Sequence, residues 1–139
     1  MLERKVIAFG VFDGFHDGHK HFLYEASRQG DFLIVVVARD EVVRHLKNCS
    51  PQYSLKERVA ALEDTEIADM VIPGDRKIGS WQVLRHERPH IVATGYDQFL
   101  IRKSIEDVFT PDQRFFEIVT VSPYKAGRYH SSLLFNDDE

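Results

Sequence analysis

The sequence predicts an α/β fold, with one doubly wound domain built around a mainly parallel five-stranded sheet. Short apolar, β-rich runs alternate with segments of helical periodicity about five times along the chain, as in a parallel sheet with helices on both faces. The run Phe32–Ala38 is continuous and β-branched, which is typical of a strand covered on both faces. No stretch rich in Pro, Gly or Ser divides the 139 residues, and 43% of them are hydrophobic, so we expect a single packed core.

The predicted strands are short apolar runs that end at glycine, proline or polar residues. The first run ends at Gly10, the third closes at Pro73 and Gly74, and Pro89 stands just before the fourth. A turn around Pro111 and Asp112 precedes the last run, which is β-rich but alternates less cleanly. The five predicted strands are Lys5–Phe9, Phe32–Ala38, Met70–Ile72, His90–Thr94 and Phe116–Val121.

The segments between these runs carry helical spacing. In His19–Arg28, Phe22, Leu23 and Ala26 share one face, and Gly30 is a fitting stop. A capping-box pattern formed by Ser54 and Glu57 opens a predicted helix from Leu55 to about Asp64. The other predicted helices are Asp40–Leu46, Ser80–His86, Phe99–Phe109 and a start at Ser131. We therefore expect one Rossmann-like domain over residues 1–135, followed by an acidic tail, 136–139, that frays.

Composition excludes several classes of function. The formal net charge of -4 provides no global basic field for nucleic acid, so no nucleic-acid partner is expected. A single cysteine, Cys49, permits neither an internal disulfide nor a cysteine metal cluster and fits a reducing compartment. The longest apolar run is far shorter than the about 20 residues that span a bilayer, and the first residues lack the pattern of a signal peptide. A cytoplasmic protein without a membrane partner is expected.

Chemistry is expected where the predicted strands end, because ligands of doubly wound sheets bind beyond the carboxyl ends of the strands. The first strand runs into residues 10–19 (Gly-Val-Phe-Asp-Gly-Phe-His-Asp-Gly-His) and then directly into a helix. Glycines allow a tight turn and a close approach to a ligand, and a helix N-terminus favours phosphate. His16 and His19 add donors that strengthen as negative charge builds in a transition state. Two histidines around Asp17 and Gly18 at a helix start favour a phosphate site over an incidental turn.

The same residues carry a resemblance to a known family. Residues 16–19 match the HxGH motif of the nucleotidylyltransferase superfamily, and residues 10–20 are similar to the opening of FAD synthetases and of glycerol-3-phosphate and other cytidylyltransferases. Residues 38–41 (Ala-Arg-Asp-Glu) with Lys47 resemble the family's acidic turn and mobile phosphate-binding lysine. Residues 54–58 resemble its helix with a functional arginine, and residues 94–98 its base and ribose segment. His130-Ser131-Ser132 resembles its late serine motif near the triphosphate.

The resemblance implies a direct in-line displacement, in which an acceptor phosphate oxygen attacks the α-phosphorus of a nucleoside triphosphate and pyrophosphate leaves. Such a reaction requires positioning and charge stabilisation rather than an enzyme nucleophile. It implies Mg²⁺ bridging the phosphates, with Asp13 as a metal ligand. The expected catalytic residues are His16, His19 and Lys47. The expected nucleotide-binding residues are Gly10, Phe12, Asp13, Gly18, Arg58, Gly95, Asp97, Gln98, His130, Ser131 and Ser132.

Several of these residues also have structural interpretations. Asp13 suits a turn residue that binds local N–H groups as well as a metal ligand. Arg58 can pair with Glu57 or Asp64 on its own helix, or reach into the site. Asp97 can cap the helix at Phe99. For Ser131 and Ser132, capping and phosphate binding are compatible.

The nucleotide and the acceptor are less sharply indicated. The glycerol-phosphate cytidylyltransferases carry an arginine that reads cytosine, and its position falls on Ala126 here. The Gly-Tyr-Asp-Gln and aromatic-His-Ser-Ser segments look closer to stand-alone archaeal-type FAD synthetases. We therefore favour ATP over CTP, with FMN as the acceptor. CMP transfer from CTP to glycerol 3-phosphate or a related phosphate is the alternative, and a non-catalytic nucleotide-binding protein is a second one.

Three further features bear on activity and assembly. The late serine motif runs into Leu133-Leu134-Phe135-Asn136 and an acidic tail, where relatives usually carry a basic residue and a longer helix. The lysine loop carries Lys47 where relatives often have two lysines. Apolar positions around Phe99–Ile101 suggest a homodimer interface.

Overall fold

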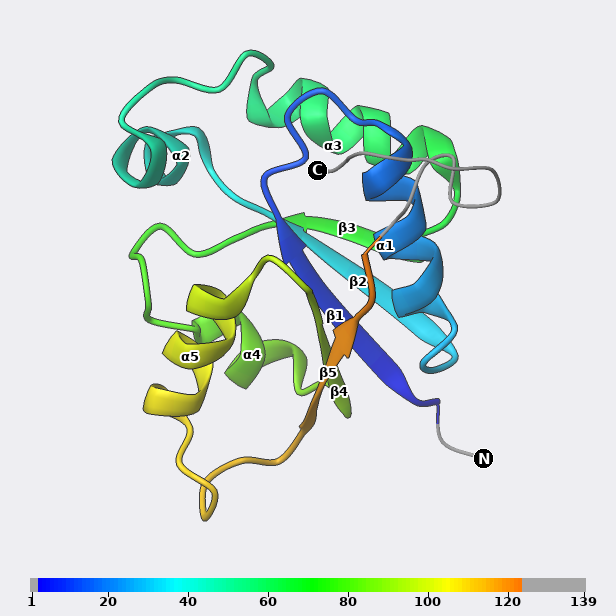
Figure 1. The fold of residues 1–139 in the computed structure, drawn as a ribbon, viewed down its shortest axis with the longest axis vertical. Coiled ribbons are helices and arrows are strands. Elements are labelled where there is room, and N and C mark those ends of the chain that lie inside the picture. The colour runs from blue at the N-terminus through cyan, green and yellow to red at the C-terminus, as the bar shows by residue number, and fades with distance from the viewer. Residues whose placement is uncertain (1–2, 124–139) are drawn as a thin grey trace.

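The computed structural model describes residues 3–123 and shows a five-stranded sheet that is parallel throughout. The strand order is β3-β2-β1-β4-β5, which confirms the predicted doubly wound, Rossmann-like fold (Figure 1). All five predicted strands form. They are β1 (Lys5–Gly10), β2 (Phe32–Val37), β3 (Met70–Pro73), β4 (Ile91–Gly95) and β5 (Glu117–Val121).

Helices cover both faces of the sheet. Helices α1 and α3 pack on one face and α4 and α5 on the other, whereas α2 lies beyond the end of β2 (Figure 1). The bounds are α1 (Asp17–Ser27), α2 (Asp40–Lys47), α3 (Leu55–Thr65), α4 (Gln82–Glu87) and α5 (Phe99–Val108). The capping box of Ser54 and Glu57 is confirmed. The helix start predicted at Ser131 lies outside the described residues.

The first helix begins two residues before its predicted start at His19. Its N-cap is His16, whose side chain accepts a hydrogen bond from the Gly18 N–H. Because the usual N-cap residues are Ser, Thr, Asp and Asn, the capping pattern did not reveal this start.

The core is divided by the alternation of side chains along the central strand. Val6 and Ala8 of β1 point into the cluster beneath α1 and α3, and Ile7 and Phe9 into the cluster beneath α4 and α5. Strand β1 is buried along its middle because it lies between β2 and β4 and because helices cover both faces of the sheet. This double burial explains the nearly continuous apolar character of β1 and β2.

The strand order reverses at β1, between β2 and β4. The chain runs outward from β1 through β2 to β3, and the next connection returns it to β4, on the opposite side of β1. Gln98 joins the two strand ends, because its Nε2 donates to the Phe9 carbonyl at 2.8 Å and its Oε1 accepts the Gly95 N–H at 2.9 Å. A crevice at this point is the expected ligand position of such a sheet.

Among the helices of residues 3–123, none has the length and apolar character that crossing a membrane requires.

Candidate active site

A cleft of about 710 Å³ opens at this reversal point, beyond the carboxyl ends of β1, β4 and β5. Most of the predicted site residues line it together, although they come from segments nearly 90 positions apart. The loop before α1 forms one wall, and the segment after β4 forms another. The predicted residues in the lining are Gly10, Phe12, Asp13, His16, Gly18, His19, Lys47, Gly95, Asp97 and Gln98.

The two histidines of the loop are held by the backbone of the helix start. His16 Nδ1 accepts the Gly18 N–H at 3.1 Å, and His19 Nδ1 accepts the His16 N–H at 3.2 Å. A backbone amide only donates, so each Nδ1 is unprotonated and each neutral ring carries its proton on Nε2. The rings stack with centroids 3.8 Å apart. The capping bonds thus fix two Nε2–H donors at the α1 N-terminus, where the helix dipole also favours an anion.

Gly18 leaves the space that this arrangement needs. A Cβ at residue 18 would lie 2.9 Å from His16 Cε1 and 3.1 Å from His16 Nδ1, well inside contact distance. The glycine between the two histidines therefore lets the His16 ring fold over the first turn of α1.

Gly10 has a similar relation to Phe12. Phe12 adopts a positive φ of 55°, and its ring lies over Gly10, where a Cβ would come within 2.6 Å of Phe12 Cζ. The ring is 4% exposed and packs edge-on against His19, with centroids 5.3 Å apart. Phe12 therefore belongs to the floor of the cleft and supports His19 from below.

His19 is held in its neutral form. Burial of the ring, with the neighbouring charges of His16 and Lys47, lowers the His19 pKa from 6.5 to about 4. A neutral imidazole at neutral pH retains the Nδ1 lone pair that the His16 N–H requires. His19 is therefore a neutral hydrogen-bond donor at neutral pH, not an imidazolium.

Asp13 connects the histidine loop to the segment before α3. Its two carboxylate oxygens accept the N–H groups of Gln52 and Tyr53 at 2.7 and 2.8 Å. Partial burial raises its pKa, but these bonds and the charges of Arg58 and Lys47 outweigh that effect, so the pKa is lowered. Asp13 therefore binds backbone N–H groups, but they belong to residues about 40 positions away and not to its own turn, so the turn interpretation is wrong. Its role as a metal ligand stays a prediction.

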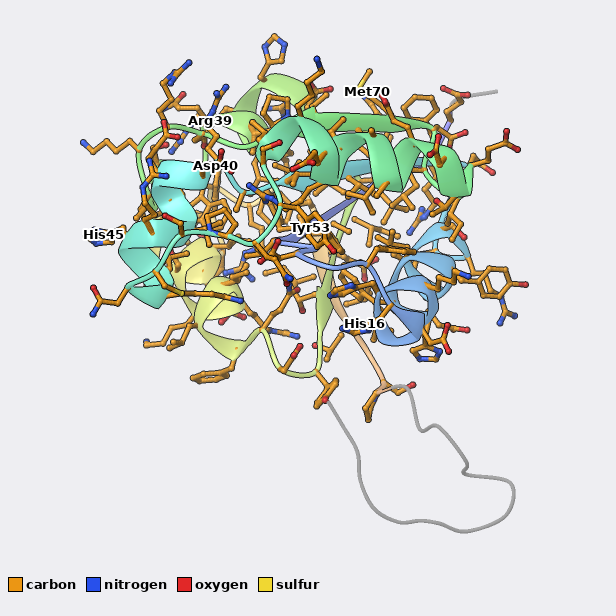
Figure 2. All side chains as sticks on the ribbon, turned by 90° about the horizontal axis from the view of Figure 1, so that it is seen from above. His16, Arg39, Asp40, His45, Tyr53 and Met70 are labelled. Carbon is orange, nitrogen blue, oxygen red and sulfur yellow. The ribbon has the colours of Figure 1, made fainter. Side chains whose placement is uncertain are left out.

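Lys47 is the last residue of α2 and lines the cleft. Asn48 ends the helix in the left-handed conformation, with φ at 60°. An exposed ammonium on a flexible stem at a helix end is suited to following a phosphate. Figure 2 looks onto this region, with Tyr53 and His16 drawn near its centre and α2 at one side.

The structure does not bring Arg58 to the cleft. Its side chain is 1% exposed, and its Nη2 pairs with Asp40, not with Glu57 or Asp64. Its Nε donates to the Tyr53 carbonyl, and its Nη1 donates to the carbonyls of Val11 and Ala38. In this structure the guanidinium organises the loops around the cleft, and direct nucleotide binding by Arg58 stays a prediction.

The segment after β4 lies opposite the histidine loop. Gln98 is the N-cap residue of α5, and no side-chain capping bond is made there, so Asp97 does not take the capping role. Asp97 is exposed and lines the cleft beside Gly95, which leaves its carboxylate available to a ligand. Of the remaining predicted residues, His130, Ser131 and Ser132 lie outside the described part of the chain.

Other residues of the lining were missed. His21, Tyr96, Ser122 and Pro123 also line the cleft, and His21 Nε2 lies 2.9 Å from the Ser122 carbonyl. The strand-end rule that identified residues 10–19 also applies to Ser122, which follows β5, but a single serine without a glycine turn or a helix start beside it forms no recognisable motif.

Within residues 3–123 no group of three or more His, Cys, Asp or Glu side chains converges on a point that would hold a metal ion. Asp13 and Asp97 offer single carboxylates in the cleft. Mg²⁺ therefore stays a prediction.

The fold and the cleft together define a Rossmann-like α/β domain with a cleft at the reversal point of its sheet and a histidine pair at a helix N-terminus. A sequence model of the cytidylyltransferase-like family matches residues 7–132, and the chain belongs to this family.

Curated relatives and solved structures agree with this placement. The chain is 38% identical over 94 residues to a FAD synthase of Thermococcus sibiricus, which is 68% of this chain but 64% of the relative's length. A FAD synthase of Methanosarcina barkeri is 37% identical over 103 residues, which is 74% of this chain and 72% of the relative. The chain thus spans somewhat less than two thirds of the first of these relatives.

Two solved structures resemble the fold. A lipopolysaccharide core biosynthesis protein from Thermoplasma volcanium superposes with a TM-score of 0.80 at 31% identity, covering 88% of this chain and 99% of that one. A pantoate-beta-alanine ligase from Francisella tularensis, in complex with beta-gamma ATP and beta-alanine, has a TM-score of 0.58 at 11% identity, over 94% of this chain and 66% of that one. The second likeness concerns the fold alone.

Proposed function

We propose that the protein is a nucleotidyltransferase that moves AMP from ATP to FMN and releases pyrophosphate. The observation that carries this proposal is the pair of Nε2–H donors of His16 and His19, held at the α1 N-terminus in the same cleft as Lys47. The choice of ATP and FMN rests on the similarity to proteins named FAD synthase.

The reaction is an in-line displacement at the α-phosphorus. A phosphate oxygen of the acceptor attacks, the bond to the bridging oxygen of pyrophosphate breaks, and negative charge builds on the phosphoryl oxygens. His16 and His19 donate hydrogen bonds to these oxygens, and the N-terminus of α1 adds its partial positive charge. Lys47 neutralises the departing phosphates. No side chain needs to form a covalent intermediate, since both reactants are positioned in one cleft.

The cleft fits a magnesium ion that is held mainly by substrate. Mg²⁺ in nucleotide sites takes one or two carboxylates together with phosphate oxygens and water. Asp13 and Asp97 supply oxygen donors of that kind, and the lowered pKa keeps Asp13 ionised. When bound, the ion would neutralise the phosphate charge and orient the leaving group.

The proposal is tested by pyrophosphate release with Mg²⁺, with ATP and CTP each combined with FMN, glycerol 3-phosphate and riboflavin. Release with ATP and FMN, together with formation of FAD, is the expected result. Riboflavin is the matched control for FMN, because it lacks the phosphate that attacks. No FAD from ATP and FMN in a folded protein that binds ATP would contradict the proposal.

The alternative substrates are separated in the same experiment. The matched family is cytidylyltransferase-like, which favours CTP as the second candidate nucleotide, with glycerol 3-phosphate or a related phosphate as acceptor. Pyrophosphate release with CTP and not ATP would select that alternative. A nucleotide-binding protein without activity would be stabilised thermally by nucleotide and release no pyrophosphate.

A homodimer and a cytoplasmic location remain predictions. Phe99 and Leu100 at the start of α5 are 68% and 78% exposed, which is unusual for two consecutive large apolar side chains. Light scattering during size-exclusion chromatography, with Leu100→Ser as the comparison, tests the dimer. A monomer at micromolar concentration would contradict it.

A further inference from the structure

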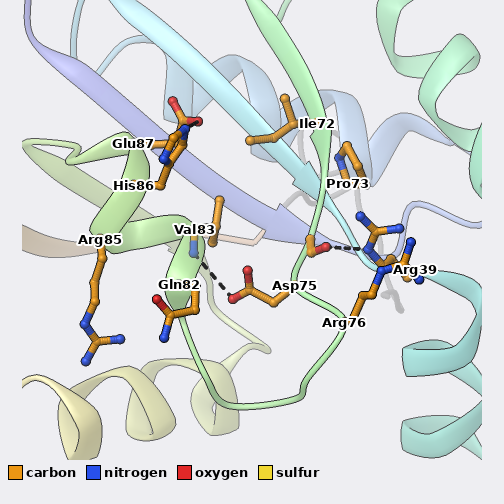
Figure 3. Close-up of a pocket in the computed structure, with 11 residues that line it drawn as sticks. Arg39, Ile72, Pro73, Asp75, Arg76, Gln82, Val83, Arg85, His86 and Glu87 are labelled. Carbon is orange, nitrogen blue, oxygen red and sulfur yellow. Dashed lines mark hydrogen bonds and ion pairs between the residues drawn. The ribbon is translucent and has the colours of Figure 1, made fainter.

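A second cavity opens at the same edge of the sheet, beyond the ends of β2 and β3. Its volume is about 640 Å³, and it shares no lining residue with the histidine cleft. The segment after β3 forms one side and α4 the other, as Figure 3 shows. Its lining residues are Arg39, Ile72, Pro73, Gly74, Asp75, Arg76, Gln82, Val83, Arg85, His86 and Glu87.

Arg39 presents a partly used guanidinium to this cavity. The side chain is half-buried, and its Nε donates to the Gly74 carbonyl at 2.7 Å, which fixes the plane of the group. Its two Nη groups have no hydrogen-bond or ion-pair partner within residues 3–123. The Nε edge of this half-buried guanidinium is fixed and its Nη edge is unpaired, so the Nη edge can bind an anion.

The acidic residues of the cavity do not neutralise Arg39. Asp75 Oδ2 accepts from Ser80 Oγ at 3.1 Å and from the Val83 N–H at 3.4 Å, so this carboxylate is turned toward the start of α4. Glu87 lies near His86 on the far wall, with 3.8 Å between Glu87 Oε2 and His86 Nε2 (Figure 3).

The other two arginines of the lining do not change the unpaired positive charge of Arg39. Arg76 is drawn at the same end of the cavity as Arg39, and its partner Glu41 lies 3.3 Å away in an exposed pair that solvent screens strongly (Figure 3). Arg85 turns away, because it donates to the Ser80 carbonyl and stacks over Phe109 at 4.7 Å. At this end of the cavity Arg39 therefore keeps a positive charge that no carboxylate of residues 3–123 pairs with.

The walls of the cavity are held in place around this end. Trp81 and Arg88, which flank the six residues of α4, both have a φ of 50°. Such conformations are costly for side chains other than glycine and persist where the surroundings enforce them. Trp81 Nε1 donates to Ser104 Oγ at 2.9 Å, and Arg88 stacks on Phe115 at 3.8 Å. Gln82, on the first turn of α4, adds an exposed amide to the lining.

We infer that this second cavity is an oxyanion site, in which the Nη edge of Arg39 binds two oxygens of a phosphate group. Two parallel N–H donors match two phosphate oxygens, which a lysine cannot reproduce. The phosphate can belong to a phosphorylated small molecule or be free inorganic phosphate. The site is separate from the cleft where the proposed transfer takes place.

The test is a titration of ¹⁵N-labelled protein with inorganic phosphate at constant ionic strength, followed by NMR. The expected result is a saturable shift of the Gly74 and Gln82 amides and of the Arg39 Nε–H signal. Arg39→Gln is expected to weaken this binding at least tenfold, as estimated for loss of a bidentate charged pair. Arg44→Gln, which removes the same charge at an exposed position of α2, is expected to leave it unchanged. A shift that does not saturate, or that persists in Arg39→Gln, would overturn the inference.

Arg39→Lys is the control for a folding defect, because it keeps the positive charge but places it on a single donor nitrogen. It is expected to melt close to the parent protein and to bind phosphate with intermediate affinity. Parent-like phosphate binding by Arg39→Lys would overturn the bidentate geometry.

Titration with FMN and riboflavin identifies the source of the phosphate. Saturation of the same signals by FMN but not by riboflavin would assign the site to phosphorylated small molecules. A response to inorganic phosphate alone would assign it to the free ion. The titration measures binding without turnover, so it succeeds or fails independently of the proposed AMP transfer.

Discussion

The guanidinium of Arg58 lies directly against the carboxylate of Asp40, and through this pair a fully buried cation is tied to the first residue of α2. The same guanidinium holds the carbonyl of Val11, at the base of the histidine loop. The segments that carry His16 and Lys47 are thus fastened to one side chain. Their mutual position depends on a residue that does not touch the cleft.

Arg58→Met is therefore expected to lower both stability and activity. The substitution leaves the Asp40 carboxylate and three carbonyls without their hydrogen-bond donor. We therefore expect a loss of about 3 kcal/mol in the free energy of unfolding, measured by urea denaturation. Lys56→Met, an exposed change on the same helix, is the control and should be neutral within about 0.5 kcal/mol. If Arg58→Met does not fold, Arg58→Lys, with fewer donors, should show a smaller loss. An unchanged urea midpoint in both variants would contradict the role of Arg58 in holding these segments together.

The two loop histidines should contribute to the reaction more than to the fold. His16→Ala and His19→Ala are each expected to lower kcat by about 100-fold or more, the scale of losing one charge-stabilising donor. Each also loses a capping bond, which costs about 1 kcal/mol. His16→Asn separates the two effects, since its amide oxygen can replace Nδ1 as the capping acceptor without restoring the Nε2–H donor. His45→Ala, on the exposed side of α2, is the control, and full activity in His16→Asn would refute the assignment.

Gly18→Ala tests the space above the helix start. The new methyl would displace the His16 ring, although alanine itself favours a helix. We expect kcat to fall toward the value of His16→Ala while the melting temperature changes little, as followed by circular dichroism and pyrophosphate release. Lys20→Ala, in the same turn, should retain parental kcat. Parental turnover in Gly18→Ala would show that the ring does not need its present position.

Lys47→Ala should have a milder effect. Loss of one mobile charge is expected to reduce kcat about tenfold, equivalent to roughly 1.4 kcal/mol in the activation barrier. Arg44→Ala, one turn earlier on α2, removes the same charge away from the cleft and should leave kcat unchanged. Equal rates for Lys47→Ala and the parent protein, in single-turnover measurements, would mean that Lys47 is only solvated.

The lowered pKa of His19 predicts a dependence of stability on pH. Between about 4, the pKa in the folded protein, and 6.5 in the unfolded chain, the unfolded chain binds more protons. The free energy of unfolding therefore rises with pH across this window, and the contribution of His19 is lost as pH falls through it. Urea denaturation at several pH values should show a shallower slope for His19→Asn than for the parent. Identical slopes would contradict a neutral, half-buried His19.

The strands and the histidine loop could be predicted because their information is local. Apolar runs bounded by Gly10 or Pro73 mark strands, and a loop between strand and helix has a known position at the edge of a parallel sheet. The start of α1 was not predicted because His16 serves as its N-cap in place of the usual residue types.

The ion-pair partner of Arg58 could not be predicted from the sequence, for a different reason. Sequence spacing suggested Glu57 or Asp64, which lie on the same helix, whereas Asp40 is 18 positions away and is brought near by packing. The cavity at Arg39 depends in the same way on α4 and the end of β3 meeting in space. Pairings of this kind leave no periodic signal in a single sequence.

The position of β1 in the middle of the sheet also determines when the protein becomes competent during its synthesis. Strands β1, β2 and β3 emerge from the ribosome first and can pair side by side, but β1 then keeps one edge open until β4 arrives, because Val6 pairs with Ile91. Until then the histidine loop faces no opposite wall, and the exposed backbone of β1 can recruit a strand from another chain. Pairing of β4 with β1 thus removes an exposed edge of the nascent chain and brings a second wall to the cleft, which β5 then completes.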